Sequence, residues 1–268
     1  MELPKTTKKQ QEILSLIYLY RFLNSTQIQT FLNHTNKSKI NIWLSDLMKK
    51  NYLNQIHKKD FNQNHTPTTY YLSGNGIRFI SDLPGTEHLN LAKYYREILR
   101  TEDFIQRRTF LADIVLSLSI QNTDKVTYRA YLPSELAKEE PNLNVFARLN
   151  PDLILIRFEQ KRNELYLLEL ISSTLPLSSF KKRLTDYGAF IETTVLTDKT
   201  DGLRLNTLTL LLVCADKLQM IRSKRYLKRI EQNAPLPQNI TVWLTYQGAI
   251  KEKGLTGRIW EEVRPASG

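Results

Sequence analysis

The chain has 268 residues, 41% of them hydrophobic, which is enough for one large domain or two smaller ones with proper cores. Its net charge of +11 favours a polyanionic partner, either nucleic acid or an acidic membrane surface. No apolar run approaches the roughly 20 residues that cross a bilayer, and the N-terminus lacks the apolar core of a signal peptide, so we expect a cytoplasmic protein without a membrane partner. One cysteine and four scattered histidines exclude a disulfide framework and show no zinc-ligand spacing.

The first 50 residues carry three helical patterns in succession. Thr6 or Thr7 can cap the first helix, and a polar break at residues 33–36 separates the second from the third. The spacing i, i+4, i+7 in the third pattern places its apolar residues on one face of a helix. The apolar positions of the three patterns are, in order, Ile13, Leu14, Leu16, Ile17, Tyr20 and Phe22; Ile28, Phe31 and Leu32; and Ile40, Leu44 and Leu47.

Two short runs of alternating residues follow these helices, at 53–57 and 68–72, and a basic, polar segment joins them. Helix, turn, helix and two-stranded hairpin, in that order, predict a winged helix-turn-helix over residues 1–85. These residues carry 11 basic and 5 acidic side chains, a net charge of +6. More than half of the excess positive charge therefore lies in less than a third of the chain.

The third helix is polar and basic on the face opposite its apolar stripe. Because a helix fits the major groove of DNA, we expect side chains of this face to contact base edges, and flanking lysines to contact phosphates. The candidates for base contacts are Ser38, Lys39, Asn41 and Ser45; those for the DNA backbone are Lys37 and Lys49, with Lys58, Lys59 and His65 on the hairpin loop. The alternative is a winged helix that contacts only protein, or a helical domain whose polar faces are simply solvated.

A domain boundary is predicted at Leu83-Pro84-Gly85. Residues 86–122 continue as a connecting long helix, or as helices broken near Thr101, and dimerisation is an equal interpretation of the first half. From residue 123 to 268, strands and helices predict an α/β (α+β) domain whose mixed sheet is covered on both faces. The expected strands are 126–132, 151–158, 164–172, 207–214 and 241–246; the expected helices are 178–191 and 215–232, and residues 142–150 are expected to form an irregular loop.

Two carboxylates, Asp152 and Glu169, belong to consecutive strands joined by a short turn, so we expect them to approach each other at one end of the sheet. Such a pair can hold Mg²⁺ against a scissile phosphate. The layout resembles the PD-(D/E)xK (restriction-endonuclease-like) nuclease fold, in which a lysine stands two positions after the glutamate. Here that position is Ile171, and Lys181 or Lys182 of the next helix would have to replace the lysine.

Structural roles are the alternative for both carboxylates. Asp152 would then cap a strand, and Glu169 would be a partly buried partner of a basic residue in the following helix. We favour a nuclease-like domain that binds or assembles without cutting, and hence no cofactor. The rival hypothesis is a Mg²⁺-dependent endonuclease or nickase that uses Asp152 and Glu169, with these two residues as metal ligands.

The last predicted helix is strongly basic. Its cations would either bind phosphates in a salt-sensitive, sequence-independent manner or form a solvated outer face. These cations are Lys217, Arg222, Lys224, Arg225, Lys228 and Arg229, and the residues expected to point inward are Leu218, Ile221, Leu227 and Ile230.

The order of these elements, together with NPDLIL (150–155), YLLELISSTLPLSSFKKRLTDY (166–187) and YYLSGNGIRFI (70–80), resembles the replication-relaxation family of plasmids and integrative elements over about residues 10–232. The resemblance implies a double-stranded-DNA-binding protein of a mobile genetic element, acting in replication or relaxation or in the transcriptional regulation of those genes. A homodimer and contacts with other replication or transfer proteins are compatible with it. An assembly protein, with the winged helix as its docking surface, is a third hypothesis.

Overall fold

The computed structural model describes residues 2–56, 67–84, 91–135, 141–159, 162–174, 176–193, 208–233 and 240–263. The chain divides into two compact units, Met1–Leu116 and Ser117–Gly268. Helices and a mixed sheet together confirm the predicted α/β class. Among the described residues, no helix is long and apolar enough to cross a membrane.

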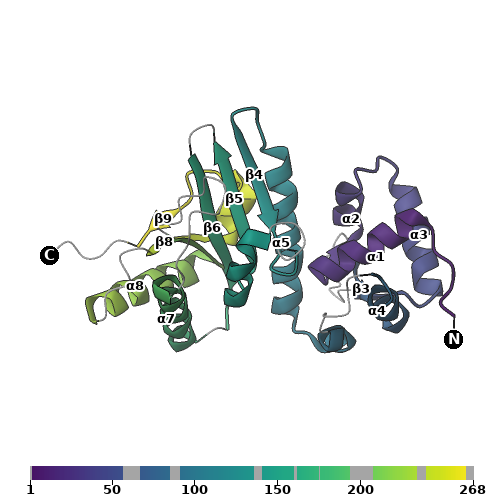
Figure 1. The fold of residues 1–268 in the computed structure, drawn as a ribbon, viewed down its shortest axis with the longest axis horizontal. Helices are drawn as coiled ribbons and strands as arrows, with labels where there is room; N and C mark the ends of the chain where they lie inside the picture. Colours follow the sequence, from purple (N-terminus) through teal and green to yellow (C-terminus); the bar gives the residue numbers. More distant parts are fainter. Residues whose placement is uncertain are drawn as a thin grey trace. The chain divides into compact units, whose positions relative to one another are not determined.

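The N-terminal unit follows the element order predicted for a winged helix-turn-helix (Figure 1). Strand β3 pairs antiparallel with both β1 and β2, so the three form one small sheet. The unit comprises α1 (Lys8–Tyr20), β1 (Leu23–Asn24), α2 (Ser25–Phe31), α3 (Lys37–Lys49), β2 (Leu53–Ile56), β3 (Thr69–Leu72), α4 (Gly74–Ser81), the 3-10 helix η1 (Leu91–Leu99) and most of α5 (Glu102–Ile120).

The helices of this unit begin and pack as their sequences predict. Thr7 caps α1 in a capping box with Gln10, and the side chain of Asn36 caps α3 by accepting a hydrogen bond from the backbone N–H of Lys39 at 3.0 Å. The predicted apolar stripe of α3 is fully buried. It packs in a core with residues of α1, α2 and the strands; the residues with at most 1% exposure include Ile13, Leu14, Ile17, Phe22, Ile28, Ile40, Leu44 and Leu47.

A buried ion pair ties the segment after residue 90 to the winged helix. The Arg21 guanidinium donates from Nε to Glu97 Oε1 at 2.8 Å, and Glu97 is only 1% exposed. The same guanidinium lies 4.6 Å from the centroid of the Phe104 ring. Helix η1 also contacts α4 and β3. For these reasons residues 91–116 form part of the N-terminal unit, although the sequence suggested a separate connection.

Gly76 allows α4 to pack closely against the backbone of Tyr52, the residue before β2. A Cβ atom at this position would lie 2.3 Å from the carbonyl oxygen of Tyr52, whereas a Cβ at Gly74 would meet nothing within 4 Å. We therefore expect Gly76→Ala to lower the free energy of unfolding by about 1–3 kcal/mol. Gly74→Ala is the matched control, and it should leave stability unchanged or raise it slightly. Urea titration followed by Trp43 fluorescence, in a chain that carries Trp243→Phe and Trp260→Phe, measures both, and equal effects would contradict the close contact.

The C-terminal unit contains a six-stranded mixed sheet in the order β4-β5-β6-β7-β8-β9. The first three strands are antiparallel, β6, β7 and β8 are parallel, and β9 returns antiparallel on β8. The elements are β4 (Val126–Tyr131), the 3-10 helix η2 (Pro141–Leu149), β5 (Leu153–Glu159), β6 (Arg162–Ile171), α7 (Leu177–Thr193), β7 (Leu208–Cys214), α8 (Lys217–Asn233), β8 (Ile240–Tyr246), α9 (Gln247–Lys253) and β9 (Glu261–Glu262).

Both faces of this sheet are apolar. One face packs against α7, α8 and η2, which contribute Leu184, Tyr187, Leu227 and Phe146 to the core. Helices α7 and α8 lie side by side (Figure 1). On the opposite face, residues such as Leu168 are also buried. The near-continuous apolar strands of the sequence therefore predicted correctly a sheet that is buried on both faces.

Two local predictions in this unit were wrong. Residues 141–149 form the 3-10 helix η2 instead of an irregular loop, because Phe146 enters the core at 1% exposure. In α8, Leu218 and Ile221 are 56% and 36% exposed instead of facing inward. Met220 and Ser223 face the core in their place, so α8 is rotated relative to the expected orientation.

Candidate nucleic-acid interface

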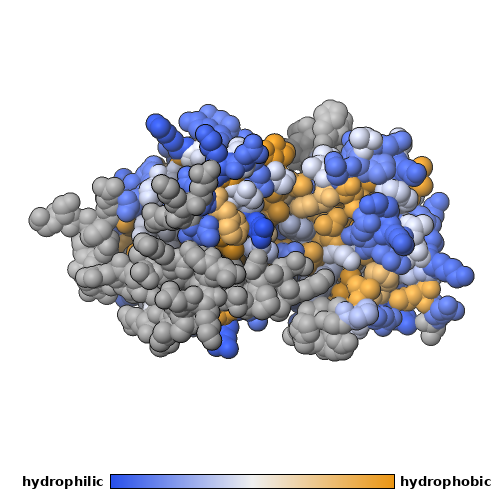
Figure 2. Space-filling model, turned by 45° about the horizontal axis from the view of Figure 1, so that its top comes forward, coloured by the Kyte–Doolittle hydropathy of each residue, from blue (hydrophilic) through white to orange (hydrophobic). Residues whose placement is uncertain are grey.

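Helix α3 exposes the whole set of its residues that the sequence assigns to DNA. Figure 2 shows the N-terminal unit at the right, with both hydrophilic and apolar surface. The exposed residues of the set are Lys37, Ser38, Lys39, Asn41, Ser45 and Lys49, and the buried stripe consists of Ile40, Leu44 and Leu47. The structure thus exposes three cations and three short polar side chains on α3. Lys58, Lys59 and His65 lie outside the described residues.

Two further side chains of α3, both apolar, belong to this surface and were not predicted. Ile42 is 65% exposed, and Trp43 is half-buried, with Lys39 Nζ 5.8 Å from its ring centroid. The ring of His34, from the turn before α3, meets the Trp43 ring edge-on at 5.2 Å between centroids. Both residues fall outside the i, i+4, i+7 stripe. Apolar residues outside that stripe were the sequence pattern from which this part of the surface could have been predicted.

A network of polar contacts sets the position of α3. The side chain of Gln10 donates to Asp46 Oδ2 at 2.6 Å, and Lys50 Nζ lies 2.7 Å from the same oxygen. The hydrogen bond from Lys50 has the larger effect and that from Gln10 the smaller, and both lower the pKa of Asp46 below its usual value. Beside them, α1 and α3 enclose a shallow depression of about 610 Å³, which Asn41, Ile42 and Lys49 help to line. Helix α1 therefore fixes the position of α3 and forms one side of the depression next to its exposed residues.

In the C-terminal unit, the predicted carboxylates come together at one end of the sheet. The backbone N–H of Asp152 donates to the carbonyl of Leu168 at 3.0 Å. Its carboxylate oxygen Oδ2 accepts a hydrogen bond from the backbone N–H of Leu170 at 2.9 Å. Asp152 is thus hydrogen-bonded to Leu168 and Leu170, the two neighbours of Glu169, which agrees with the predicted hairpin. The structural alternative for Asp152, a cap at the start of a strand, agrees with these bonds.

The carboxylate of Glu169 is engaged by α7. Arg183 donates from Nε to Glu169 Oε1 at 2.7 Å, and a second guanidinium nitrogen lies 2.6 Å from the same oxygen. The Tyr187 hydroxyl also donates to this oxygen, and Arg183 reaches the carbonyl of Asn150 at 2.8 Å. Glu169 is therefore the buried partner of a basic residue in the following helix.

The electrostatics of this cluster follow from burial. Burial raises the pKa of the Glu169 carboxyl, while the Arg183 guanidinium opposes that shift. Burial also raises the pKa of Tyr187, and the neighbouring Glu169 adds to the effect, so the hydroxyl keeps its proton and acts as a donor. A positive guanidinium on Glu169 leaves this end of the sheet poorly suited to a divalent cation.

The residues around Glu169 do not fit a Mg²⁺ centre. Mg²⁺ requires several oxygen ligands in near-octahedral geometry, and here one carboxylate oxygen is shared by Arg183 and Tyr187. In the described part of the chain, no group of three or more histidine, cysteine or acidic side chains could hold a metal ion. Lys181 and Lys182 are exposed on α7, and Ile171 is buried at 4% exposure.

Helix α8 presents a second basic surface. Its exposed cations are Lys217, Arg222, Arg225, Lys228 and Arg229. Lys224 differs from them, because its Nζ pairs with Glu261 Oε2 at 2.5 Å. Leu218 and Ile221 are exposed on the same helix. The surface is therefore both cationic and partly apolar.

Comparisons with known proteins agree with the motifs. The model of the replication-relaxation family matches residues 14–205. No curated protein matches the chain. Among solved structures, restriction endonuclease FokI bound to DNA matches with a TM-score of 0.26 and 11% sequence identity, over 92% of this chain and 45% of that one. The chain thus spans less than half the length of that structure.

Proposed function

The chain belongs to the replication-relaxation family, and from that membership we propose that it binds double-stranded DNA through the exposed face of α3. The main support for this proposal is that Lys37, Lys39, Asn41 and their neighbours are exposed on α3, whose apolar stripe is fully buried. In this proposal α3 enters the major groove, where lysines contact phosphates and short polar side chains contact base edges. The exposed Ile42 suits the methyl group of thymine.

The biological setting follows from the family and is part of the proposal. The protein acts in the replication or relaxation of a plasmid or integrative element, or in the transcriptional regulation of its genes. Its partners are duplex DNA, a second copy of the chain on a two-fold symmetric site, and other replication or transfer proteins. The net charge of +11 supports an association with a polyanion.

The nuclease-like unit has a binding or structural role in this proposal. The pairing of Glu169 with Arg183 and Tyr187 supports a domain without catalytic activity. Ile171 stands where the PD-(D/E)xK pattern has its lysine, and this also supports a domain without catalytic activity. We therefore do not assign Asp152 and Glu169 to metal-dependent cleavage.

A single titration tests the proposal. The full chain is titrated onto supercoiled plasmid and short duplexes carrying the DNA upstream of its own gene, or a scrambled version, at about 150 mM salt with Mg²⁺ present. A sequence-preferring complex without cleavage is expected on a gel. Absence of any retained DNA would overturn duplex binding. Nicked or linear plasmid that disappears in Asp152→Ala would make the protein an enzyme.

Helix α8 is proposed to add a sequence-independent contact. Replacing Arg222, Arg225 and Lys228 by alanine should weaken binding to every duplex equally, because phosphate contacts carry no sequence information. The slope of log affinity against log salt should fall by about 0.9 for each phosphate contact that the variant removes. Lys224→Ala is the matched control, since that cation already pairs with Glu261 and should change the slope least. An unchanged slope in the triple variant would assign α8 to a solvated face.

A further inference from the structure

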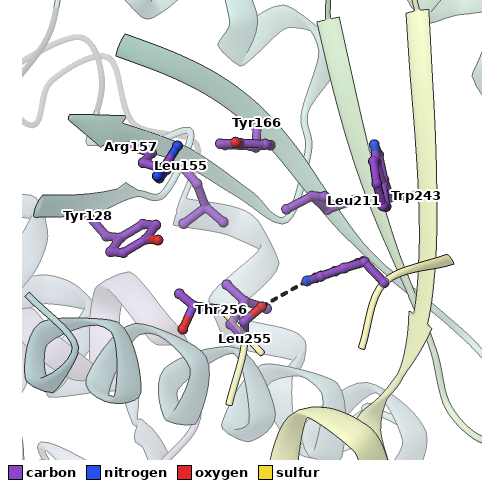
Figure 3. A pocket seen from close by; sticks show the side chains of 9 residues that line it. Tyr128, Leu155, Arg157, Tyr166, Leu211, Trp243, Leu255 and Thr256 are labelled. Atoms are coloured by element: carbon purple, nitrogen blue, oxygen red, sulfur yellow. Dashed lines mark hydrogen bonds between the residues drawn. The ribbon is translucent and has the colours of Figure 1, made fainter. Parts of the chain in front are cut away.

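A pocket of about 350 Å³ opens on the C-terminal unit, away from the Glu169 cluster. Its wall includes Tyr166 of β6, which lies three residues before Glu169 and so points to the opposite face of the sheet. Four aromatic rings line the pocket, together with three leucines, one arginine and one threonine (Figure 3). The rings belong to Tyr128, Tyr166, Trp243 and Trp260.

The rings are held in place but remain accessible. They come from β4, β6, β8 and the segment after α9, so the sheet spaces three of them around the cavity (Figure 3). Trp260 is fixed by a hydrogen bond from its Nε1 to the carbonyl of Leu255 at 2.8 Å. All four residues are only partly buried. The pocket is therefore lined by aromatic rings against which a flat ring can pack.

The charges at the pocket disfavour an anionic ligand. Arg157 lines the wall, and its guanidinium pairs with Glu159 and with Glu164, each at 3.0 Å. Because two carboxylates compensate this cation, the wall formed by the described residues lacks the excess charge that would bind a phosphate or a carboxylate. The four aromatic rings and the few polar groups of the wall suit an uncharged planar ring with hydrogen-bonding groups at its edge.

We propose that this pocket binds one nucleobase, stacked on the indole rings of Trp243 and Trp260. Arg157, Tyr128 and Thr256 supply polar groups for the edge of the base. The base comes either from a free nucleotide or from an unpaired nucleotide of single-stranded DNA. This site goes beyond the proposed duplex contact of α3, because a base inside a duplex is stacked and paired and does not reach such a pocket.

Intrinsic fluorescence provides the test, since two of the three tryptophans lie in the pocket. In the full chain with Trp43→Phe, emission comes from Trp243 and Trp260 alone. Deoxyadenosine monophosphate, thymidine monophosphate, short oligo(dA) and short oligo(dT) are titrated separately, with inorganic phosphate as the control probe. Saturable quenching by a nucleotide or an oligonucleotide, and none by phosphate, is expected, because base stacking alters indole emission.

A pocket-filling variant makes the result specific. Thr256 is exposed at the rim, so Thr256→Phe places a ring in the cavity without removing a core side chain. It should weaken nucleobase binding about tenfold or more. Duplex binding should stay unchanged and thermal unfolding should change little, since the variant loses only the exposed hydrogen bond from the Thr256 hydroxyl to Gln121 Oε1. Quenching by mononucleotides identifies free nucleotides as the source, and quenching by oligonucleotides alone identifies unpaired DNA. No quenching by any nucleotide, or the same quenching in Thr256→Phe, would overturn the site even if duplex binding by α3 holds.

Discussion

Replacing Glu169 by alanine is expected to lower the free energy of unfolding by about 1–3 kcal/mol, because it leaves the partly buried Arg183 guanidinium and the buried Tyr187 hydroxyl without their partner. The variant removes both bonds between Arg183 and the carboxylate, and it deprives the buried Tyr187 hydroxyl of its acceptor. Urea titration of the full chain with Trp43→Phe, followed by the fluorescence of Trp243 and Trp260, measures this effect in the unit that contains the pair. Arg183→Ala should destabilise the unit by a similar amount.

The coupling between the two residues gives the sharper result. In a double-mutant cycle, Glu169→Ala with Arg183→Ala should cost clearly less than the sum of the single variants, since each single change already removes the shared bonds. Lys224 and Glu261 form the matched control, as a pair in the same unit whose carboxylate side chain is 48% exposed, against 12% for Glu169. Glu261→Ala should cost less than about 1 kcal/mol. If Glu169→Ala leaves stability unchanged but abolishes Mg²⁺-dependent cleavage, the carboxylate is catalytic and the structural role is wrong.

The second large effect is expected on α3. Lys37→Ala with Lys49→Ala should lower affinity for any duplex on the order of 30-fold at about 150 mM salt, if each lysine contacts one phosphate. The slope of log affinity against log salt should fall by about two in magnitude. Fluorescence polarisation with labelled duplexes at several salt concentrations measures both. Lys251→Ala with Lys253→Ala removes the same charge from α9 and controls for net charge.

Base-contacting residues should behave differently from these lysines. Asn41→Ala is expected to reduce the preference between the specific and the scrambled duplex by about 1–3 kcal/mol, because a side-chain contact to a base edge discriminates between sequences. The salt slope should stay the same, since the variant keeps every phosphate-binding cation. If Asn41→Ala weakens both duplexes equally, α3 binds DNA without direct base contacts. If both the lysine variant and Asn41→Ala bind like the parent chain, the α3 interface is wrong.

Local periodicity was sufficient to predict most elements. The stripe of Ile40, Leu44 and Leu47 predicted both the helix and its buried face, and hence the exposed residues opposite it. The long apolar strands predicted a sheet buried on both sides. Such patterns succeed because neighbouring side chains on a helix or strand share one environment, and their spacing along the chain records it.

Helix α8 shows where periodicity fails. The helix has cations on several sides, so few apolar residues define its orientation, and Leu218 with Ile221 suggested the wrong one. Met220 and Ser223 enter the core in their place, whereas Leu227 is buried as predicted. The rotation of such a helix is decided by how its side chains fit the neighbouring strands and α7, which its own sequence does not encode.

By itself, the amino-acid sequence determined the order of the main helices and strands, the polar residues of α3 and the pairing of the two strands that bring Asp152 and Glu169 together. Only the tertiary structure decided that Arg183, and neither Lys181 nor Lys182, reaches Glu169. Successive residues of a helix point about 100° apart, so which of three consecutive cations faces the sheet depends on how the helix is docked. The same holds for the aromatic pocket, whose rings between Tyr128 and Trp260 come together only when distant strands pair.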